Sequence, residues 1–477
     1  MNTLSNQNNM YLKHILLGWL LIPLAVVGQE SYSMSLQQAQ DYAAQHSYVV
    51  RTASYDAEAA SRGVKETITI GLPQVNGSID YNNYIDIPTQ VAPADAFGFP
   101  DYLVEFLGGV SAETGVPLDA PQTDPNAISE FQFGAKQTMT AGVSVSQLIF
   151  DGSYFVGLKA AKTYAEVMQG NVARTQRDVK AAVAEAYHMV LIARENVSIL
   201  EESRGVLETT RKETAAMVQQ GFLEQQDLDQ IDLSLSDLAN RINHAQQQQT
   251  IAMDLLKFQM GMPMNNSLEV TDTVDGLMAE GAEALLQTAY SFQSSIDYRV
   301  LDTQIRLMDL NVKNEKAKSL PSIGGFYNYQ RNAQRDEFNF FDSDGKWYPI
   351  QLWGVQLKMP IFTSLRGVHR VAKAKVEAER ARMNMEQAQQ GANLEYLNAK
   401  NDYSLALATL DNRQQSLSLA DRIYKTTQTK YAQGVSSSFE LAQAHSQLIS
   451  AQGNYISSML EVLNAKTRLG KSLNQYE

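Results

Sequence analysis

The sequence predicts a mainly α-helical fold that also contributes strands to a membrane β-barrel. Three observations predict it. Four short segments alternate apolar and polar residues, two proline-free stretches (151–220 and 363–433) repeat apolar residues at heptad spacing, and a set of motifs occurs twice in the same order. Each subunit would therefore supply four β-strands, a long α-helical coiled-coil part and two internal structural repeats.

Composition excludes several classes of function. The chain has 477 residues and a net charge of −13, and no stretch is strongly basic. Because phosphate binding needs clustered lysine and arginine, a nucleic-acid partner is not expected. The chain also has no cysteine, which removes disulfides, thiolate metal sites, cysteine nucleophiles and an N-terminal lipid anchor.

Residues 1–28 are predicted to be a secretory signal peptide. Lys13 precedes an apolar run from Ile15 to Val27, and the small residue Gly28 stands directly before a plausible cleavage point. The alternative is a membrane anchor, but a run interrupted by Pro23 is short for a span of roughly 20 residues. No later apolar run approaches that length, so an exported chain would be either soluble or a β-barrel.

Matching motifs divide the mature chain into a first repeat, 29–270, and a second repeat, 271–477. Each is predicted to contain a helix, a β-hairpin and a long helix pair. The matches pair Leu72-Pro73 with Leu320-Pro321, the segment GVSVSQLIFDGS from Gly142 with GVQLKMPIFTSL from Gly354, Gly221 with Gly434, and Gly261 with Gly470.

The first hairpin carries the longer connection, residues 86–130. This segment holds eight acidic residues, no basic residue and half of the prolines of the chain. Such a composition predicts a loop, extracellular in a membrane barrel, with a short helix near Tyr102 to Leu107.

The four alternating segments place apolar residues on one face, at the length of about ten residues that a membrane strand needs. The apolar series are Val75, Gly77, Ile79 and Tyr81; Met139, Ala141, Val143 and Val145; Ile323, Gly325, Tyr327 and Tyr329; and Trp353, Val355 and Leu357. The aromatic girdles would come from Tyr81, Tyr84, Tyr327, Tyr329, Trp347 and Tyr348.

The alternative for these strands is a half-buried sheet on a soluble core. A membrane barrel needs about eight strands at least, and an open edge in lipid leaves backbone groups unpaired. A barrel therefore requires an oligomer of at least two copies.

Apolar residues step by three and four along both long segments and along the helix that follows each. The series are Val179, Val183, Ala186, Val190, Ala193, Val197 and Leu200; Val371, Ala374, Ala378, Ala381, Met385, Ala388 and Ala392; Leu228, Ile231, Leu235, Leu238, Ile242 and Ala245; and Leu441, Ala444, Leu448, Ala451, Tyr455, Ser458 and Val462. This spacing predicts left-handed coiled coils. Helices of about 70 residues would reach roughly 100 Å, and Gly221 and Gly434 stand where each long helix turns back.

These features resemble the TolC-like outer-membrane efflux protein family over essentially the whole mature chain. The most specific motifs are the paired Leu-Pro strand openings, LIFDG at Leu148 to Gly152, PIF at Pro360 to Phe362 and the two glycine turns. The resemblance implies a homotrimer with a 12-stranded β-barrel in outer-membrane lipid and a helical barrel in the periplasm. It also implies a periplasmic adaptor protein and an inner-membrane pump as partners.

The resemblance further implies a gate at the periplasmic entrance. Tyr431 matches the family's gating tyrosine, while Glu440 and Asp227 match acidic positions just past the two glycine turns. Gly221 and Gly434 would mark the tip turns where an adaptor docks. The alternative for both acids is that they only complement the positive ends of their helices.

Two departures from the family pattern put a copied gate network in question. Ser436 stands where better-known members carry an arginine, and Gln443 stands where a second acid is common. The gate of this chain would then rest on fewer charged groups.

The predicted function is an outer-membrane exit channel of a tripartite efflux pump. The alternatives are a type I protein secretion duct of the same fold and a non-channel coiled-coil structural or surface protein, which would have no use for four amphipathic strands. No catalytic motif is present, so the chain is not expected to be an enzyme or to bind a cofactor. A copper site at Met260, Met262 and Met264 is the weaker alternative to a turn after a helix.

Overall fold

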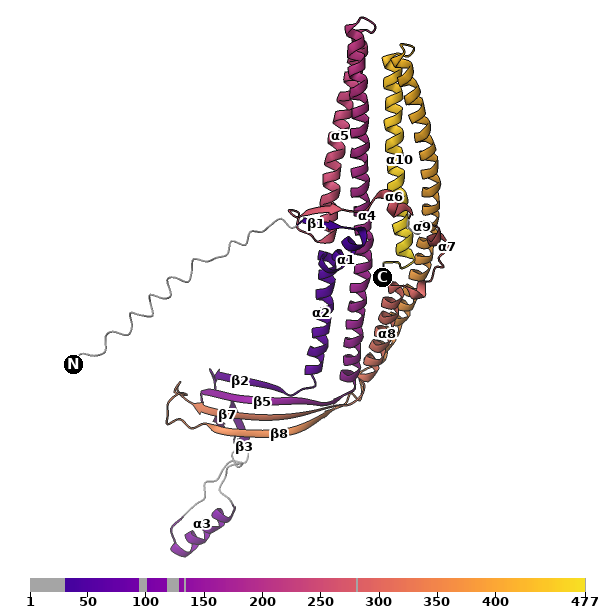
Figure 1. Ribbon diagram of the computed structural model, residues 1–477. Coiled ribbons are helices and arrows are strands. Elements are labelled where there is room, and N and C mark those ends of the chain that lie inside the picture. Colours follow the sequence, from indigo (N-terminus) through magenta and orange to yellow (C-terminus); the bar gives the residue numbers. More distant parts are fainter. Residues whose placement is uncertain (1–30, 94–100, 118–127, 133, 280–281, 477) are drawn as a thin grey trace, which may run out of the picture. The chain divides into compact units, whose positions relative to one another are not determined.

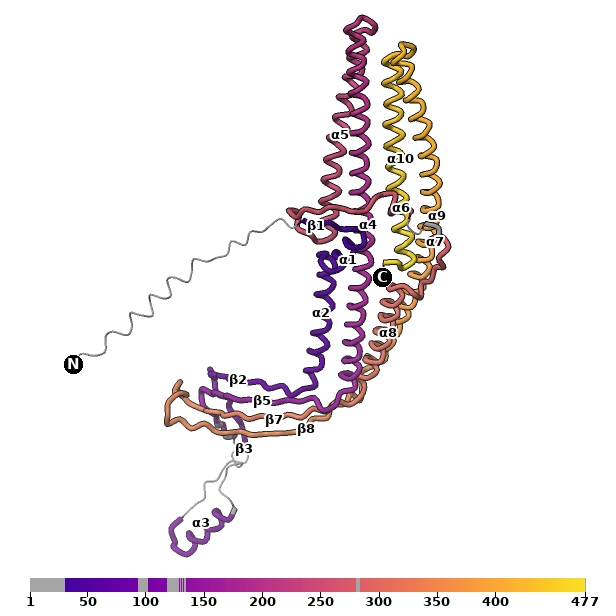
Figure 2. Tube along the Cα trace, in the orientation of Figure 1, coloured from indigo at the N-terminus to yellow at the C-terminus, as the bar shows by residue number. Residues whose placement is uncertain are grey.

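The computed structural model describes residues 31–93, 101–117, 128–132, 134–279 and 282–476 (Figures 1 and 2). The predicted signal peptide, residues 1–28, lies outside these ranges. The chain divides into two compact units. A sheet unit combines Ser61–Lys162 with Leu307–Ala378, and a helical unit combines the preceding residues with Thr163–Arg306 and Glu379–Glu477.

The sheet unit is built on one antiparallel four-stranded sheet. Its strands are β2 (Gln74–Asn83), β5 (Gln137–Asp151), β7 (Ser322–Arg335) and β8 (Tyr348–Lys358), in the spatial order β2-β5-β7-β8. All four predicted strands are confirmed. Among the described residues, β2 and β8 each pair along one side only, which leaves two open edges.

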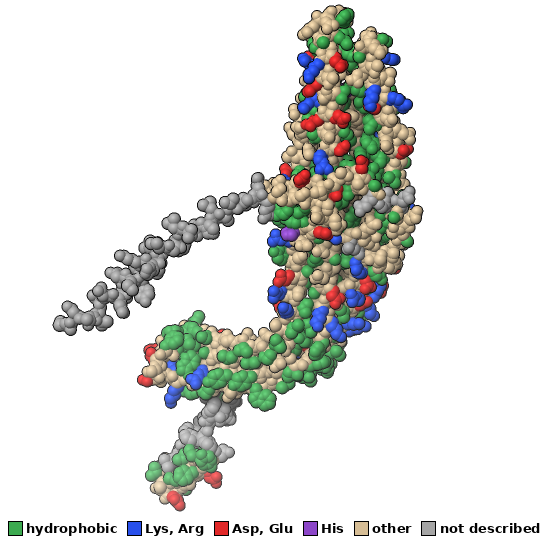
Figure 3. Space-filling model, viewed as in Figure 1, with side chains coloured by type: hydrophobic (Ala, Val, Ile, Leu, Met, Phe, Trp, Pro, Cys, Tyr) green, Lys and Arg blue, Asp and Glu red, His purple; other side chains and the backbone are tan. Residues whose placement is uncertain are grey.

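The register gathers the predicted apolar residues on one face. Val75 stands opposite Val145, which faces Tyr327, which in turn faces Trp353. Many of these side chains are open to solvent in the single chain, and Figure 3 shows hydrophobic side chains gathered over the sheet. Near the start of β8, Ile350 and Leu352 depart from the pattern. They fall on the polar face, because the two-residue period runs unbroken through the strand.

The long connection between β2 and β5 has more structure than predicted. Residues 86–130 were expected to form a loop with a short helix near Tyr102 to Leu107. The predicted helix is present but longer, since α3 spans Asp101–Thr114, and β3 (Thr89–Pro93) pairs with β4 (Ile128–Gln132) in an antiparallel ribbon that was not predicted. The ribbon joins residues too far apart in sequence for a local pattern to reveal.

Four helices form two antiparallel hairpins, and the parts of them in the helical unit lie side by side (Figure 1). They are α4 (Gly152–Gln219) with α5 (Gln225–Met260), and α9 (Arg366–Ala432) with α10 (Ser438–Ser472). The heptad positions of these helices are buried or half-buried, as predicted. One buried cluster joins both hairpins and contains Leu200, Leu207, Ile231, Leu238, Ile242, Ala245, Tyr424, Tyr431, Leu441, Ala444 and Leu448.

The helices α2 (Tyr48–Thr69) and α8 (Ile296–Ala317) stand directly before the two β-hairpins, where the sequence places one helix in each repeat. The shorter elements form a belt beside the hairpins that the sequence did not reveal. The belt comprises β1 (Ser31–Met34) parallel to β6 (Ser267–Val270), with α1 (Leu36–His46), α6 (Val274–Ala279), α7 (Ala282–Gln287) and the 3-10 helix η2 (Phe292–Ser294). The buried Tyr187 of α4 anchors it, since its hydroxyl donates to the carbonyl of Met34 at 3.0 Å. The strand pair β1–β6 bridges residues more than 200 positions apart, beyond the reach of periodicity.

The methionines of QMGMPM belong to this part of the core. Met260 and Met262 are 0% and 2% exposed in the cluster around Tyr187, while Met264 is exposed. Gly261 between them has φ 72°, and a Cβ there would lie 2.4 Å from the carbonyl oxygen of His46. The segment is the turn after α5, and the thioethers of Met260 and Met262 fill the core.

Among the described residues, no helix is both long enough and apolar enough to cross a bilayer.

Candidate functional site

The two hairpin turns have the same backbone geometry. Gly221 has φ 78° and Gly434 has φ 70°. In each turn the glycine N–H and the next N–H donate back into the last turn of the helix, Gly434 to Tyr431 and Val435 to Lys430, both at 2.9 Å. This pair of bonds is a Schellman motif, which needs a left-handed residue and so favours glycine. The predicted roles of both glycines as helix-ending residues are confirmed, and the two segments are called the tip turns below.

Glu440 closes the start of α10. Its backbone N–H donates to Ser437 Oγ at 3.2 Å, and its carboxylate accepts from the Ser437 N–H at 3.2 Å and from the Ser436 hydroxyl. The Ser436 bond, followed by the Ser437 bond, lowers the pKa of Glu440. Ser436, the departure from the family pattern, therefore forms a hydrogen bond with Glu440 within the same turn.

Asp227 occupies the equivalent position at the start of α5. Its carboxylate accepts a hydrogen bond from the Glu224 N–H at 3.2 Å. Both acids thus satisfy backbone donors that a helix start leaves free. This geometry favours the helix-end interpretation for each acid within one chain, and their role around a shared entrance stays a proposal.

Tyr431 lies in the interior of the hairpin pair. It is 4% exposed, and its hydroxyl oxygen is 3.1 Å from Oγ1 of Thr214 on α4, which is 1% exposed. Burial raises the pKa of Tyr431, and the nearby charge of Asp227 adds to the effect. Tyr431 thus bonds to the first hairpin through Thr214, whereas Asp227 and Glu440 each make their bonds to their own helix starts.

Sequence reasoning missed three buried hydroxyl-bearing residues between Leu200 and the end of α4, and one of them is the partner of Tyr431. Ser203 Oγ lies 2.9 Å from Nε2 of His445, and Thr210 Oγ1 accepts from Gln428 Nε2 at 3.3 Å. Together with Thr214 they are called the polar seam. Each bond of the polar seam joins α4 of the first hairpin to a helix of the second.

A signal for the polar seam was present in the sequence. The apolar series that ends at Leu200 continues at the same three-and-four spacing through Ser203, Leu207, Thr210 and Thr214. Because three of these positions are polar, an apolar periodicity search stops at Leu200. Hydroxyl groups at buried coiled-coil positions need partners, so continued spacing with polar residues would have pointed to inter-helix hydrogen bonds.

A groove lies between α5 and α10 near the tip turns. Its volume is about 410 Å³, and its lining includes Leu233, Asp237, Arg241, Phe439, Gln443 and Ile449. Phe439 and Leu233 are 69% and 66% exposed, and Phe222 and Val435 of the tip turns are exposed even further. Large apolar side chains this open to solvent are typical of a surface that another protein covers.

An open sheet with one apolar face, together with two long helical hairpins, is the architecture of a channel-forming membrane subunit. Comparison with known proteins shows which proteins the chain resembles. Residues 293–475 match the family model described as outer membrane efflux protein. The outer membrane protein TolC of Vibrio cholerae is 21% identical over 337 residues, which cover 69% of this chain and 76% of that protein.

Solved structures share the fold. The CmeC outer membrane channel of Campylobacter jejuni is 17% identical with a TM-score of 0.63, over 92% of this chain and 85% of its own. The MtrE outer membrane channel of Neisseria gonorrhoeae, solved in its open state, is also 17% identical with a TM-score of 0.63, over 92% of this chain and 88% of its own. The family-model match and the TolC relative bear out the predicted resemblance to TolC-like outer-membrane efflux proteins and the predicted outer-membrane location, and the solved structures share the fold.

Proposed function

We propose that three copies of this chain form the passive exit duct of a tripartite efflux pump, without catalysis of their own. The observation that carries the proposal is the four-stranded sheet with two open edges and an exposed apolar face. Backbone groups left unpaired in lipid cost several kcal/mol each. Pairing β2 of one copy with β8 of the next removes every edge, and three copies of four strands give twelve.

The apolar face supports burial in lipid. Ile79, Trp353 and Val355 are 77%, 75% and 62% exposed in the single chain, and all three lie on the same face by register. On a soluble protein such a face would need a covering layer. In a closed barrel it is the lipid-facing surface, and the polar face lines the lumen.

The rest of the chain divides around this barrel. Residues 1–28 direct export, and the repeats 29–270 and 271–477 each supply a hairpin of strands and a pair of helices. The connection 86–130 leaves the sheet at the end of β2 away from α4, which begins directly after β5. It is therefore extracellular when the helices are periplasmic.

The tip turns form the periplasmic entrance. A trimer brings together three copies of Asp227 and three of Glu440, and this ring of carboxylates favours cations. Tyr431 holds the second hairpin to the first through Thr214 and keeps the entrance narrow.

The adaptor protein docks on the tips, at Gly221, Gly434 and the groove between α5 and α10. The exposed Phe439 and Leu233 supply the apolar contact. An inner-membrane pump then delivers cargo through the adaptor into the duct.

Planar-bilayer recording of the purified protein tests the duct. We expect discrete, cation-selective channels, with selectivity lowered in Glu440→Gln and in Asp227→Asn. Asp254→Asn is the matched control, because this exposed acid lies at the other end of α5 and forms an ion pair with Lys257. Absence of any conductance from protein extracted from the outer membrane would contradict a duct. Unchanged selectivity in both tip variants would place the selective ring elsewhere.

A further inference from the structure

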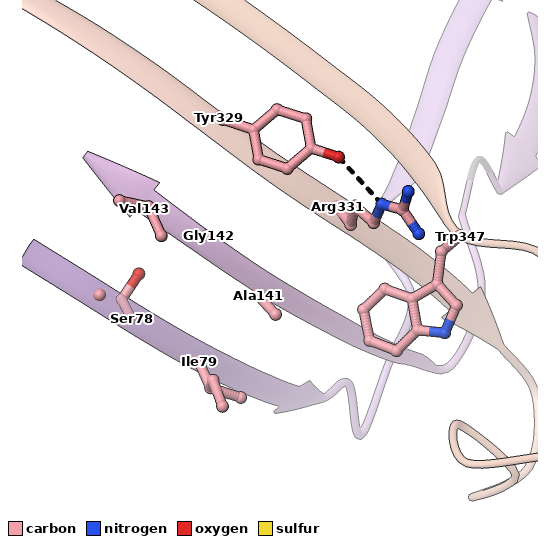
Figure 4. Close-up of a pocket in the computed structure, with 9 residues that line it drawn as sticks. Ser78, Ile79, Ala141, Gly142, Val143, Tyr329, Arg331 and Trp347 are labelled. Carbon is pink, nitrogen blue, oxygen red and sulfur yellow. Dashed lines mark hydrogen bonds between the residues drawn. The ribbon is translucent and has the colours of Figure 1, made fainter. Parts of the chain in front are cut away.

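The apolar face of the sheet contains a hollow of about 680 Å³. Gly77 and Ala141 are among the residues that line it, and the side chains of Ile79, Val143, Tyr329 and Trp347 surround Ala141 (Figure 4). The hollow exists because two neighbouring strands carry almost no side chain at its centre. A Cβ on Gly77 would meet only the carbonyl oxygen of Gly142 at 3.9 Å, so the space above this glycine is open.

A cation lies at one end of the hollow. Arg331 of β7 stands opposite Ala141 on the apolar face. Its Nε donates to the hydroxyl of Tyr329 at 3.1 Å, and its guanidinium lies between Tyr329 and Trp347 (Figure 4). Within the described part of the chain, no carboxylate forms an ion pair with it. The two terminal nitrogens of Arg331 are thus free to donate to a ligand.

The position of Arg331 along β7 sets its depth in the membrane of the proposed barrel. From Ile323 to Arg331 the strand advances eight residues, which project to about 20 Å along the barrel axis at the usual rise and tilt. The apolar band of an outer-membrane barrel is about 25 Å tall. Arg331 therefore lies near the boundary between the acyl chains and the headgroups of the outer leaflet, where phosphate groups are found.

The connection between β7 and β8 closes the hollow on its outer side. Phe340 and Trp347 fold over Met139 and Ala333 in a small buried cluster, and Tyr81 packs edge-to-face on Phe340 with ring centroids 6.0 Å apart. These aromatic side chains form a firm wall beside Arg331. Aromatic rings at headgroup depth are typical of membrane proteins.

We propose that this hollow is a binding site for an anionic, phosphate-bearing lipid of the outer leaflet, with an acyl chain over Gly77 and Ala141 and the phosphate on Arg331. The site rests on the proposed function, because a lipid-facing sheet requires the barrel. Charge complementarity fixes the occupant: the charged side chains on this face of the four strands are Arg331 and Arg335, both cations. Arg335 already donates to the carbonyls of Gln334 and Lys346, which leaves Arg331 as the phosphate ligand.

Native mass spectrometry of the purified full-length protein, titrated with phosphatidylglycerol, tests the site. We expect a discrete lipid adduct on the wild type. Arg331→Gln should weaken binding about tenfold or more, since charge-assisted hydrogen bonds to phosphate are lost. Gly77→Val should also weaken it by filling the hollow. Lys358→Gln is the matched control, because Lys358 is a cation of β8 on the opposite face.

Two further probes separate phosphate from acyl chain. Diacylglycerol of the same chains should bind more weakly than phosphatidylglycerol and be insensitive to Arg331→Gln, and inorganic phosphate alone should form no stable adduct. Equal phosphatidylglycerol binding by the wild type and Arg331→Gln would overturn the proposal. So would full competition by inorganic phosphate. The hollow lies within one chain, so lipid adducts can be counted per chain in any oligomeric state. Bilayer recording of the same preparations tests separately whether the protein conducts ions as the proposed duct.

Discussion

At the scale of single residues, the hairpins are held together by polar bonds inside an apolar coiled coil. Ser203, Thr210 and Thr214 of the polar seam are each less than 9% exposed, and each bonds to the second hairpin. Buried hydroxyls without partners would cost free energy, so these bonds fix one arrangement of the two hairpins. Each hydrogen bond of the polar seam is specific but contributes little free energy by itself. Such bonds would suit the surface between two hairpins that separate when the proposed channel opens.

Tyr431→Phe tests the bond nearest the tip turns. The variant leaves the Thr214 hydroxyl without its tyrosine partner, so we expect a loss of about 1 kcal/mol in the free energy of unfolding and a higher open probability in planar bilayers. Tyr424→Phe is the matched control. Tyr424 lies about two helical turns before Tyr431 on α9 and is also 4% exposed. Its buried hydroxyl, however, has no hydrogen-bond partner among the described residues. Equal effects of the two variants would contradict a special role for the Tyr431 hydroxyl.

His188 makes stability depend on pH. It is 3% exposed on α4, with Nδ1 3.4 Å from Oδ1 of Asn464. Burial lowers the pKa of His188 from 6.5 to about 4. Below pH 6.5 the unfolded chain takes up a proton that the folded chain refuses, so stability falls until about pH 4 and then levels off.

The expected loss from His188 is on the order of 3 kcal/mol across this window. Thermal unfolding of the wild type followed by circular dichroism between pH 7 and pH 4 should show it, and His188→Gln should flatten the decline. His244→Gln, at an exposed position of α5, should leave the pH profile as it is. A wild-type decline that His188→Gln does not change would assign it to other groups.

Some of the site residues could be predicted from the sequence and others could not. Gly221 and Gly434 were found because a glycine ending a helix has a local signature. The carboxylates of Asp227 and Glu440 were also located, but their hydrogen bonds to Glu224, Ser436 and Ser437 show that each already serves its own helix start. Thr214 continues the heptad spacing of α4 but was missed because it is polar, and its partner Tyr431, 217 residues away, could not be read from local sequence.

At the scale of elements, the helices follow directly from their heptad spacing. The seam of α5 passes through Ile231, Leu238, Ile242 and Ala245, all buried as predicted. Helix propensity alone could not hold helices of this length straight against each other. The apolar seam supplies the packing, and the tip turns fix where the chain reverses.

Leu238→Asp tests this packing. Leu238 is 2% exposed in the cluster that joins both hairpins, so the variant buries an unpaired charge and should cost several kcal/mol, about 3 or more. Gln247→Asp, on the exposed face of the same helix, should change stability by less than about 0.5 kcal/mol. Chemical denaturation of the two variants gives the comparison, and similar midpoints would mean that the seam is assigned to the wrong face.

Removal of residues 86–130 tests the insertion between β2 and β5. The last bonds of the β2–β5 ladder lie before it, with the N–H of Tyr84 donating to the carbonyl of Lys136 at 2.8 Å. We therefore expect the barrel to assemble without the segment and single-channel conductance to rise as the outer mouth opens. Cross-linked oligomers on a gel and bilayer recording measure the two effects. Failure to insert into the membrane would instead make the segment part of the barrel fold.

The elements that sequence missed share one physical property. The ribbon β3–β4 and the strand pair β1–β6 are short and depend on partners distant in the chain, so their residues carry no period of their own. The four main strands were found because each alternates over a length that a membrane imposes. The helices were found because their heptad spacing of apolar residues continues over too many residues to arise by chance.

At the scale of the whole molecule, the proposed barrel requires several copies of the chain to complete each other. A single copy leaves the outer edges of β2 and β8 unpaired and its apolar sheet face uncovered. The same requirement was evident from the sequence, because four strands cannot close a barrel. The number three came from the family resemblance and not from the chain itself.

Disulfide cross-linking of the two sheet edges tests barrel closure most directly. The chain has no cysteine, so a pair introduced at Ile79 on β2 and at Trp353, Val355 or Leu357 on β8 is free of background. Within one chain these edges are separated by β5 and β7, about 14 Å, which is too far for a disulfide.

Any bond that forms must therefore join two copies. In outer membranes containing such variants, the account predicts covalent dimers and trimers on a denaturing gel, with at least one pair yielding mainly trimer and none yielding larger species. The single variants should remain monomeric. Absence of cross-links from every β2–β8 pair, or a ladder that continues beyond three copies, would contradict a closed barrel built from three copies of this chain.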